Sequence, residues 1–417
     1  MIKKYFIILL FFLTPVQSSD FNFLHIPIQE EGRIKPLDSF ARNQLLKIYG
    51  KSKLTIYDQN NKKYKISAIN WLYSVLKQEP SSLNQNIFKI ENPTVVNALN
   101  LEITQNLTYS FNQINDGLNQ ENNQELIQKL IKADKEFLTL VEKQILDLHI
   151  KRNLFIELYN SASCVVPIMT IADSMLAEAF NIKQNESISY SYYLRNQINI
   201  HHNLQKLINL IDTKDTNNNT LFELKAIMDG ISIFENEIFI RNHSNKIRSS
   251  DILKLFPNEL EWFSPWNIID QLKTTNKISE SNNILLITLE NIFSEKKKSN
   301  TKIDLVDLTE YQNVIQNYTD INSNILMREV NYNQSNLFFW SLIFYILTLL
   351  SLLALSIFRL YSNHFKLIPI TLIIIGFLYH LSGIIIRITI LERPPVSTLY
   401  ESIIFVGLIT VLFSIIL

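Results

Sequence analysis

Four residues near the C-terminal end of the chain combine small and ionisable side chains inside an apolar run. Gly376, His380, Gly383 and Arg387 are separated by steps of four, three and four residues, so a helix places them on one face. Lipid is a poor neighbour for this face, because ionisable side chains within a membrane turn toward other helices or a cavity. The spacing therefore predicts a site inside a helix bundle.

His380 has two chemical uses in such a place. A neutral imidazole can hydrogen-bond a second helix, or one of its nitrogens can ligate a buried metal centre. The ring lies roughly 10 Å from Arg387 along the helix, because each residue adds about 1.5 Å of rise. The residue types leave both uses open.

Three apolar segments near the end of the chain would position this histidine. They cover 337–358, 367–387 and 402–417, and the first two are long enough to cross a bilayer. The loop between them carries Arg359 and Lys366, which places it in the cytoplasm under the positive-inside rule. We therefore predict a transmembrane domain, a helical bundle of at least three spans, from residue 337 onward.

The third apolar segment is short. From Ile403 to Leu417 it has 15 residues, or roughly 22 Å of helix against a hydrocarbon core of about 30 Å. A terminal carboxylate would then lie within the bilayer, where an ionised group is costly. We therefore expect this span to be incomplete and the natural protein to continue beyond Leu417.

The first residues have the layout of a secretory signal peptide. Lys3 and Lys4 precede a short apolar stretch that is followed by Pro15 and small residues, which predicts a signal peptide over 1–19. The alternative is an uncleaved anchor. In both cases the domain over 20–336 is exported, to the periplasmic side of the inner membrane.

The exported part has mostly helical periodicity, and we predict an all-α fold for the chain. The longest helix is expected over 124–161, with an apolar stripe that packs on later helices of an elongated domain. One small β-hairpin is expected, with strands near 55–57 and 64–66 around the turn-forming Asn60 and Asn61.

Composition excludes several classes of function. Lysine and arginine together number 39, as do aspartate and glutamate, so the chain has no general affinity for nucleic acid. Cys164 is the only cysteine, which excludes an internal disulfide and a C-x-x-C thiol oxidoreductase. No glycine-rich phosphate-binding loop is present.

Several stretches, in this order, resemble the cytochrome c synthase family of the System II (Ccs-type) pathway in its long fused form. They are "IPIQEEGRIKPLDSFAR", "SAINWLYSVL", "IFKIENPTVVNAL", "MREVNYNQSNLFF" and "RPPVSTLYESIIFVG". The resemblance implies a multi-pass membrane component of cytochrome c biogenesis. Such a protein moves haem to the outer face and attaches it to the C-x-x-C-H motif of apocytochrome c.

The resemblance also implies roles for individual residues. His380 becomes a candidate haem-iron ligand, and Arg387 and Arg393 become candidate partners of the haem propionates, since guanidinium groups suit carboxylates. Anchoring at the membrane interface, together with Tyr400, is the alternative for both arginines.

The family also holds haem in a tryptophan-rich outer segment, and this chain has only four scattered tryptophans. The attachment site is therefore expected beyond Leu417 or on a second subunit. A function of another class stays open as well: a membrane-tethered, exported helical sensor or scaffold without haem.

Overall fold

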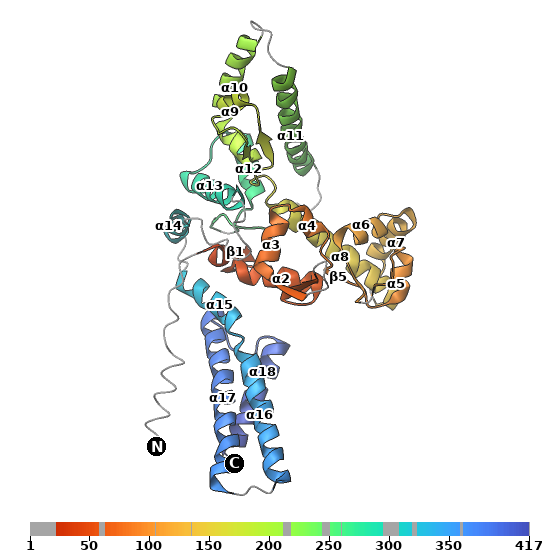
Figure 1. Ribbon diagram of the computed structural model, residues 1–417, viewed down its shortest axis with the longest axis vertical. Coiled ribbons are helices and arrows are strands. Elements are labelled where there is room, and N and C mark those ends of the chain that lie inside the picture. Colours follow the sequence, from red (N-terminus) through yellow and green to blue (C-terminus); the bar gives the residue numbers. More distant parts are fainter. Residues whose placement is uncertain are drawn as a thin grey trace. The chain divides into compact units, whose positions relative to one another are not determined.

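Figure 1 shows the computed structural model of the chain, which describes residues 22–57, 63–104, 106–134, 136–211, 218–243, 251–259, 261–294, 308–318, 323–358 and 362–416. The chain forms two compact units, one over residues 21–320 and one built on residues 321–417. We refer to them as the helical unit and the apolar-helix unit. The predicted signal peptide over 1–19 and the hairpin turn at Asn60 and Asn61 lie outside the described residues.

The helical unit consists mainly of helices, which confirms the helical part of the predicted fold. A short 3-10 helix, η1, comes first, and thirteen α-helices follow in the described residues: η1 Phe23–His25, α2 Leu37–Tyr49, α3 Ala68–Leu76, α4 Pro80–Leu83, α5 Pro93–Ala98, α6 Phe111–Leu118, α7 Glu121–Lys132, α8 Leu140–Ser161, α9 Ser174–Ala179, α10 Tyr190–Ile211, α11 Asn218–His243, α12 Pro265–Thr275, α13 Glu280–Ser294 and α14 Thr309–Tyr318.

Four antiparallel two-stranded sheets accompany these helices in the described residues: β1 Pro27–Glu30 with β2 Arg33–Pro36, β3 Lys53–Tyr57 with β4 Lys63–Ser67, β5 Phe88–Lys89 with β6 Thr108–Tyr109, and β7 Met169–Ile171 with β8 Glu186–Ile188. The pair β3–β4 is the predicted hairpin, with Thr55 opposite Lys65. The other three pairs correct the expectation of one hairpin. Their strands have only two to four residues, too few for alternation of apolar and polar residues to reveal them.

The structure contradicts the single long helix predicted over 124–161. Helix α7 ends at Lys132, and α8 begins at Leu140. The break comes from a capping box, in which the Thr139 hydroxyl accepts the Glu142 amide hydrogen (3.3 Å) and the Glu142 carboxylate accepts the Thr139 amide hydrogen (2.8 Å). Such a box begins a new helix, so the apolar periodicity belongs to two helices.

A mostly buried carboxylate, that of Glu30, joins the first hairpin to helix α2. Oε2 of Glu30 accepts hydrogen bonds from Lys35 Nζ (2.7 Å) and Asn43 Nδ2 (3.2 Å), and Oε1 accepts from Gln44 Nε2 (2.6 Å) and Lys47 Nζ (3.3 Å). Hydrogen bonds to a charged acceptor are among the stronger ones in proteins. Glu30 therefore fixes the β1–β2 hairpin against one face of α2.

We expect Glu30→Gln to lower stability at neutral pH and to lose this effect in acid. Burial opposes ionisation of Glu30, but the hydrogen bond and charge of Lys35, with Asn43 and Lys47, outweigh it and hold the pKa below its usual 4.5. The carboxylate thus stabilises the fold above about pH 4.5, and this contribution disappears as the pH falls through the lowered pKa. Chemical denaturation at several pH values measures it.

Glu125→Gln is the matched control, because Glu125 is exposed on α7 and has no ion pair among the described residues. A Glu30→Gln deficit that stayed constant from pH 7 to about pH 3 would show that ionisation of Glu30 contributes nothing.

The apolar-helix unit contains α15 Ser323–Ser335, α16 Leu337–Ile357, α17 Asn363–Leu391 and α18 Leu399–Ile416. Three stretches within it, 323–357, 367–391 and 399–416, are long and apolar enough to cross a membrane. Among the described residues this confirms the predicted minimum of three helices that could span a membrane. The third helix begins three residues before the predicted 402.

Two glycines of α17 allow α16 to approach closely. A Cβ atom on Gly376 would lie 2.8 Å from the Tyr345 ring, and one on Gly383 would lie 2.8 Å from the Phe338 ring. Small residues permit this kind of packing between membrane helices. The predicted stripe of small residues on α17 thus faces protein.

Gly383→Ala is expected to destabilise the apolar-helix unit by about 1–3 kcal/mol, because the added methyl group must displace an aromatic ring. Thermal unfolding of the detergent-solubilised protein, followed by circular dichroism, measures the loss. Gly407→Ala in α18 is the control, since its Cβ would lie 3.7 Å from His380, an ordinary contact. Equal melting temperatures for the two variants would contradict the close packing.

Candidate functional site in the apolar helices

His380 lies buried where α16, α17 and α18 meet. Its Nε2 is 3.1 Å from the carbonyl oxygen of Ile404 in α18, and its Nδ1 is 3.2 Å from the hydroxyl of Tyr345 in α16. A carbonyl only accepts, so Nε2 carries the hydrogen, and Nδ1 of the neutral ring accepts from the tyrosine. His380 therefore bridges three helices.

The surroundings of His380 are closely packed. The Phe338 ring meets the imidazole edge to face, with centroids 5.6 Å apart, and Gly407 lies on the α18 side. A metal ligand needs a free nitrogen lone pair, and here the Nδ1 lone pair is engaged by Tyr345. Both nitrogens of His380 thus have partners within the protein, and the described residues contain no group of three metal-ligating side chains.

Arg387 and Arg393 converge on a third residue, Glu401. Oε1 of Glu401 lies 2.9 Å from Arg387 Nε, 2.8 Å from Arg387 Nη2 and 3.2 Å from Arg393 Nη2. The Glu401 side chain is only 2% exposed, whereas those of Arg387 and Arg393 are 29% and 44% exposed. We call these three residues the Glu401 cluster.

The second oxygen of Glu401 begins helix α18. Oε2 accepts the amide hydrogen of Thr398 (3.1 Å), and the Thr398 hydroxyl accepts the amide hydrogen of Glu401 (3.2 Å). This reciprocal pair is a capping box. It explains why α18 begins at Leu399, earlier than the apolar run alone indicated.

The cluster holds two positive charges and one negative charge, so it keeps a net charge of +1. Arg393 is the more exposed of the two arginines and the better placed to pair with an anion from outside. A carboxylate that took both guanidinium groups would have to displace Glu401. Arg387 also has the Tyr400 ring 5.9 Å away, within the range of a cation–π contact.

The structure brings Arg387 and Arg393 together but keeps His380 apart from them. Arg387 follows His380 by seven positions along α17, a rise of about 10 Å. Glu401 is the central residue that sequence reasoning missed. Two signals could have identified it: the spacing Thr398-x-x-Glu401 of a capping box, and an acid at the start of an apolar run.

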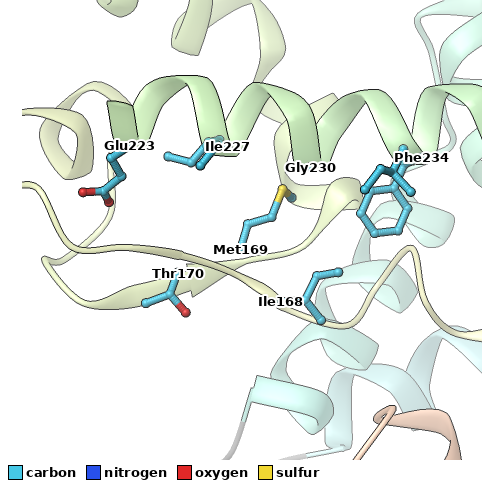
Figure 2. Close-up of a pocket in the computed structure, with 9 residues that line it drawn as sticks. Ile168, Met169, Thr170, Glu223, Ile227, Gly230 and Phe234 are labelled. Carbon is cyan, nitrogen blue, oxygen red and sulfur yellow. The ribbon is translucent and has the colours of Figure 1, made fainter. Parts of the chain in front are cut away.

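An apolar pocket of about 330 Å³ lies elsewhere, in the helical unit, between β7 and α11. Figure 2 shows Ile227, Gly230 and Phe234 on the helix above Met169 of the strand. The acid that lines it, Glu223, accepts the amide hydrogen of Asp173 (3.0 Å). The other lining side chains are nearly all apolar, so Glu223 is the one ionisable group in the wall among the described residues, and its carboxylate is engaged by backbone amides.

Glu401→Gln is expected to destabilise the apolar-helix unit, because a neutral amide leaves two neighbouring guanidinium charges without an anionic partner. Since both arginines are partly exposed, we expect a loss of about 2 kcal/mol, below that of a fully buried pair. The melting temperature in detergent should fall by about 10 °C.

Glu392→Gln is the matched control, since Glu392 is an exposed acid at the end of α17 with no ion pair among the described residues. A melting temperature for Glu401→Gln equal to that of Glu392→Gln would contradict the importance of the cluster.

No protein family and no curated protein sequence matches the chain.

Proposed function

We propose that the protein is a membrane component of cytochrome c biogenesis, in a system that exports haem and attaches it to apocytochrome c. In this proposal the apolar helices cross the inner membrane and the domain over 20–336 lies on the periplasmic side. The observation that carries the proposal is the position of the buried charged and histidine side chains. They fall in or beside the segments that resemble the cytochrome c synthase family.

Six acidic, basic or histidine side chains are buried among the described residues: His25, Lys35, Asp38, Glu329, His380 and Glu401. The first three lie in or next to "IPIQEEGRIKPLDSFAR", Glu329 lies in "MREVNYNQSNLFF", and Glu401 lies in "RPPVSTLYESIIFVG". His380 is on the helix just before that last segment. Buried ionisable groups are costly unless they are paired, so their concentration in these segments supports a role that needs defined geometry there.

The proposal assigns positioning roles to the site residues. His380 holds α16 and α18 against α17, and the Glu401 cluster holds the connection between α17 and α18. Ligation of haem iron by His380 would require the Tyr345 hydroxyl to leave Nδ1. Arg393 could contact a haem propionate without losing its present partner, because this side chain is 44% exposed.

The second candidate function is a membrane-tethered helical sensor or scaffold without haem. It is favoured by one observation: the nitrogens of His380 and both arginines already have partners within the protein. In that case the same residues serve only to fix the helices.

Deletion of the gene in the source organism tests the proposal. The covalently bound haem of c-type cytochromes, stained after denaturing electrophoresis, should fall at least about tenfold, while cytochromes that bind haem without thioethers stay unchanged. The wild-type gene should restore the stain. Unchanged c-type cytochromes in the deletion strain would overturn the proposal and leave the sensor or scaffold.

Two variants in the complemented strain separate ligation from positioning. Tyr345→Phe removes the hydroxyl from Nδ1 but keeps the ring, and His380→Ala removes both nitrogens. If His380 ligates haem, protein purified from membranes should retain haem absorbance in Tyr345→Phe and lose it in His380→Ala. If His380 only positions helices, neither variant should change bound haem, and both should lower the melting temperature.

A further inference from the structure

A second cavity in the helical unit, of about 540 Å³, has a different character from the apolar pocket of Figure 2. Its walls come from the β3–β4 hairpin, the segment after α4 and the β5–β6 sheet; α4 and β5 are labelled in Figure 1. Side chains with amide, hydroxyl and ammonium groups line most of it. Its volume is in the range of small-molecule sites.

The cavity is positively charged. Lys51, Lys63 and Lys89 line it, and the described residues that line it include no aspartate or glutamate. Lys89 lies 3.1 Å from Glu91, which is outside the lining, and Lys51 lies 5.7 Å from the Tyr49 ring centroid. A concave surface lined by one sign of charge attracts ligands of the opposite sign.

Two amide side chains add directional hydrogen-bonding groups. Oδ1 of Asn84 accepts a hydrogen bond from Asn112 (2.9 Å), so its amide nitrogen carries the donors that remain. Oε1 of Gln85 is buried and has no hydrogen-bond partner among the described residues. A buried acceptor without a partner is unfavourable by about 1–3 kcal/mol. Gln85 lines the cavity, so rotation of its side chain toward the cavity would let a ligand hydroxyl satisfy this oxygen.

We propose that this cavity, which we call the lysine cavity, binds a small anion that also carries hydroxyl groups. A sugar phosphate and a sugar acid share this chemistry. The lysines take the phosphate or carboxylate oxygens, the amide of Asn84 donates to a ligand oxygen, and Gln85 accepts from a hydroxyl. The Tyr49 ring supplies an apolar surface for a sugar face. This site is independent of the proposed role in cytochrome c biogenesis.

Calorimetric titration of the full chain in a polyoxyethylene detergent tests the proposal. Glucose 6-phosphate and glucuronate are the two anionic probes, and glucose is the neutral one. At least one anion should bind with saturation and at least about tenfold more tightly than glucose, and high salt should weaken it because the attraction is electrostatic. If glucose 6-phosphate binds more tightly, phosphate is the preferred anionic group. If glucuronate binds more tightly, carboxylate is the preferred group.

Two sets of variants locate the binding. The triple change Lys51→Gln, Lys63→Gln and Lys89→Gln should weaken binding of the preferred anion at least about tenfold. The control changes Lys129, Lys132 and Lys143 to glutamine, which removes the same total charge. These three lysines are exposed on α7 and α8 and do not line the cavity. Gln85→Met should weaken the binding of glucose 6-phosphate more than the binding of inorganic phosphate, because only the sugar has hydroxyl groups for Gln85 to accept from.

Absence of saturable binding for both anions would overturn the proposal, as would equal affinity for glucose. Equal binding by the two triple variants would show that the anion is held by general surface charge and not by the lysine cavity. Circular dichroism of each variant confirms that it is folded, and all six lysines are exposed.

Discussion

A charge buried among apolar side chains is tolerated only beside a partner of opposite sign, and the arrangement of the apolar helices depends on this constraint. Glu401 meets it through Arg387 on α17 and Arg393 in the connection that follows. One carboxylate thus joins two helices and the chain between them. The glycines of α17 complete the arrangement, because they bring α16 close enough for Tyr345 to reach His380.

The helical unit obeys the same constraint with other residues. Glu30 is surrounded by two lysines and two amides, and an ion pair between Arg195 of α10 and Glu290 of α13 joins two helices far apart in the sequence. Burial raises the pKa of Glu290 although Arg195 opposes the shift. Small sheets, ion pairs and hydrogen bonds between buried polar groups therefore stabilise the helical unit. The sequence composition predicts only that this unit is helical.

Apolar periodicity predicted the long and uniform elements. The helix boundaries that it did not predict are set by local capping interactions. The apolar helices and the β3–β4 hairpin were predicted because each extends over enough residues for a clear pattern. The break before α8 depends on the pair Thr139 and Glu142, and the start of α18 on Thr398 and Glu401. The sequence predicted that the stripe on α17 faces protein, but it did not predict which side chains the stripe contacts. Glu401 comes from the next helix, and only the folded connection shows that it meets both arginines.

The capping box of α18 connects the Glu401 cluster to the buried histidine. Glu401 and Ile404 lie three residues apart in the first turns of α18, and the carbonyl of Ile404 accepts from His380. An anion that displaced Glu401 from the arginines would act on the same side chain that caps α18, and the first turns of α18 supply the carbonyl that holds the imidazole. Anion binding at the Glu401 cluster and the orientation of His380 would then be coupled, and by reciprocity a ligand of His380 would alter the affinity of the arginines for anions.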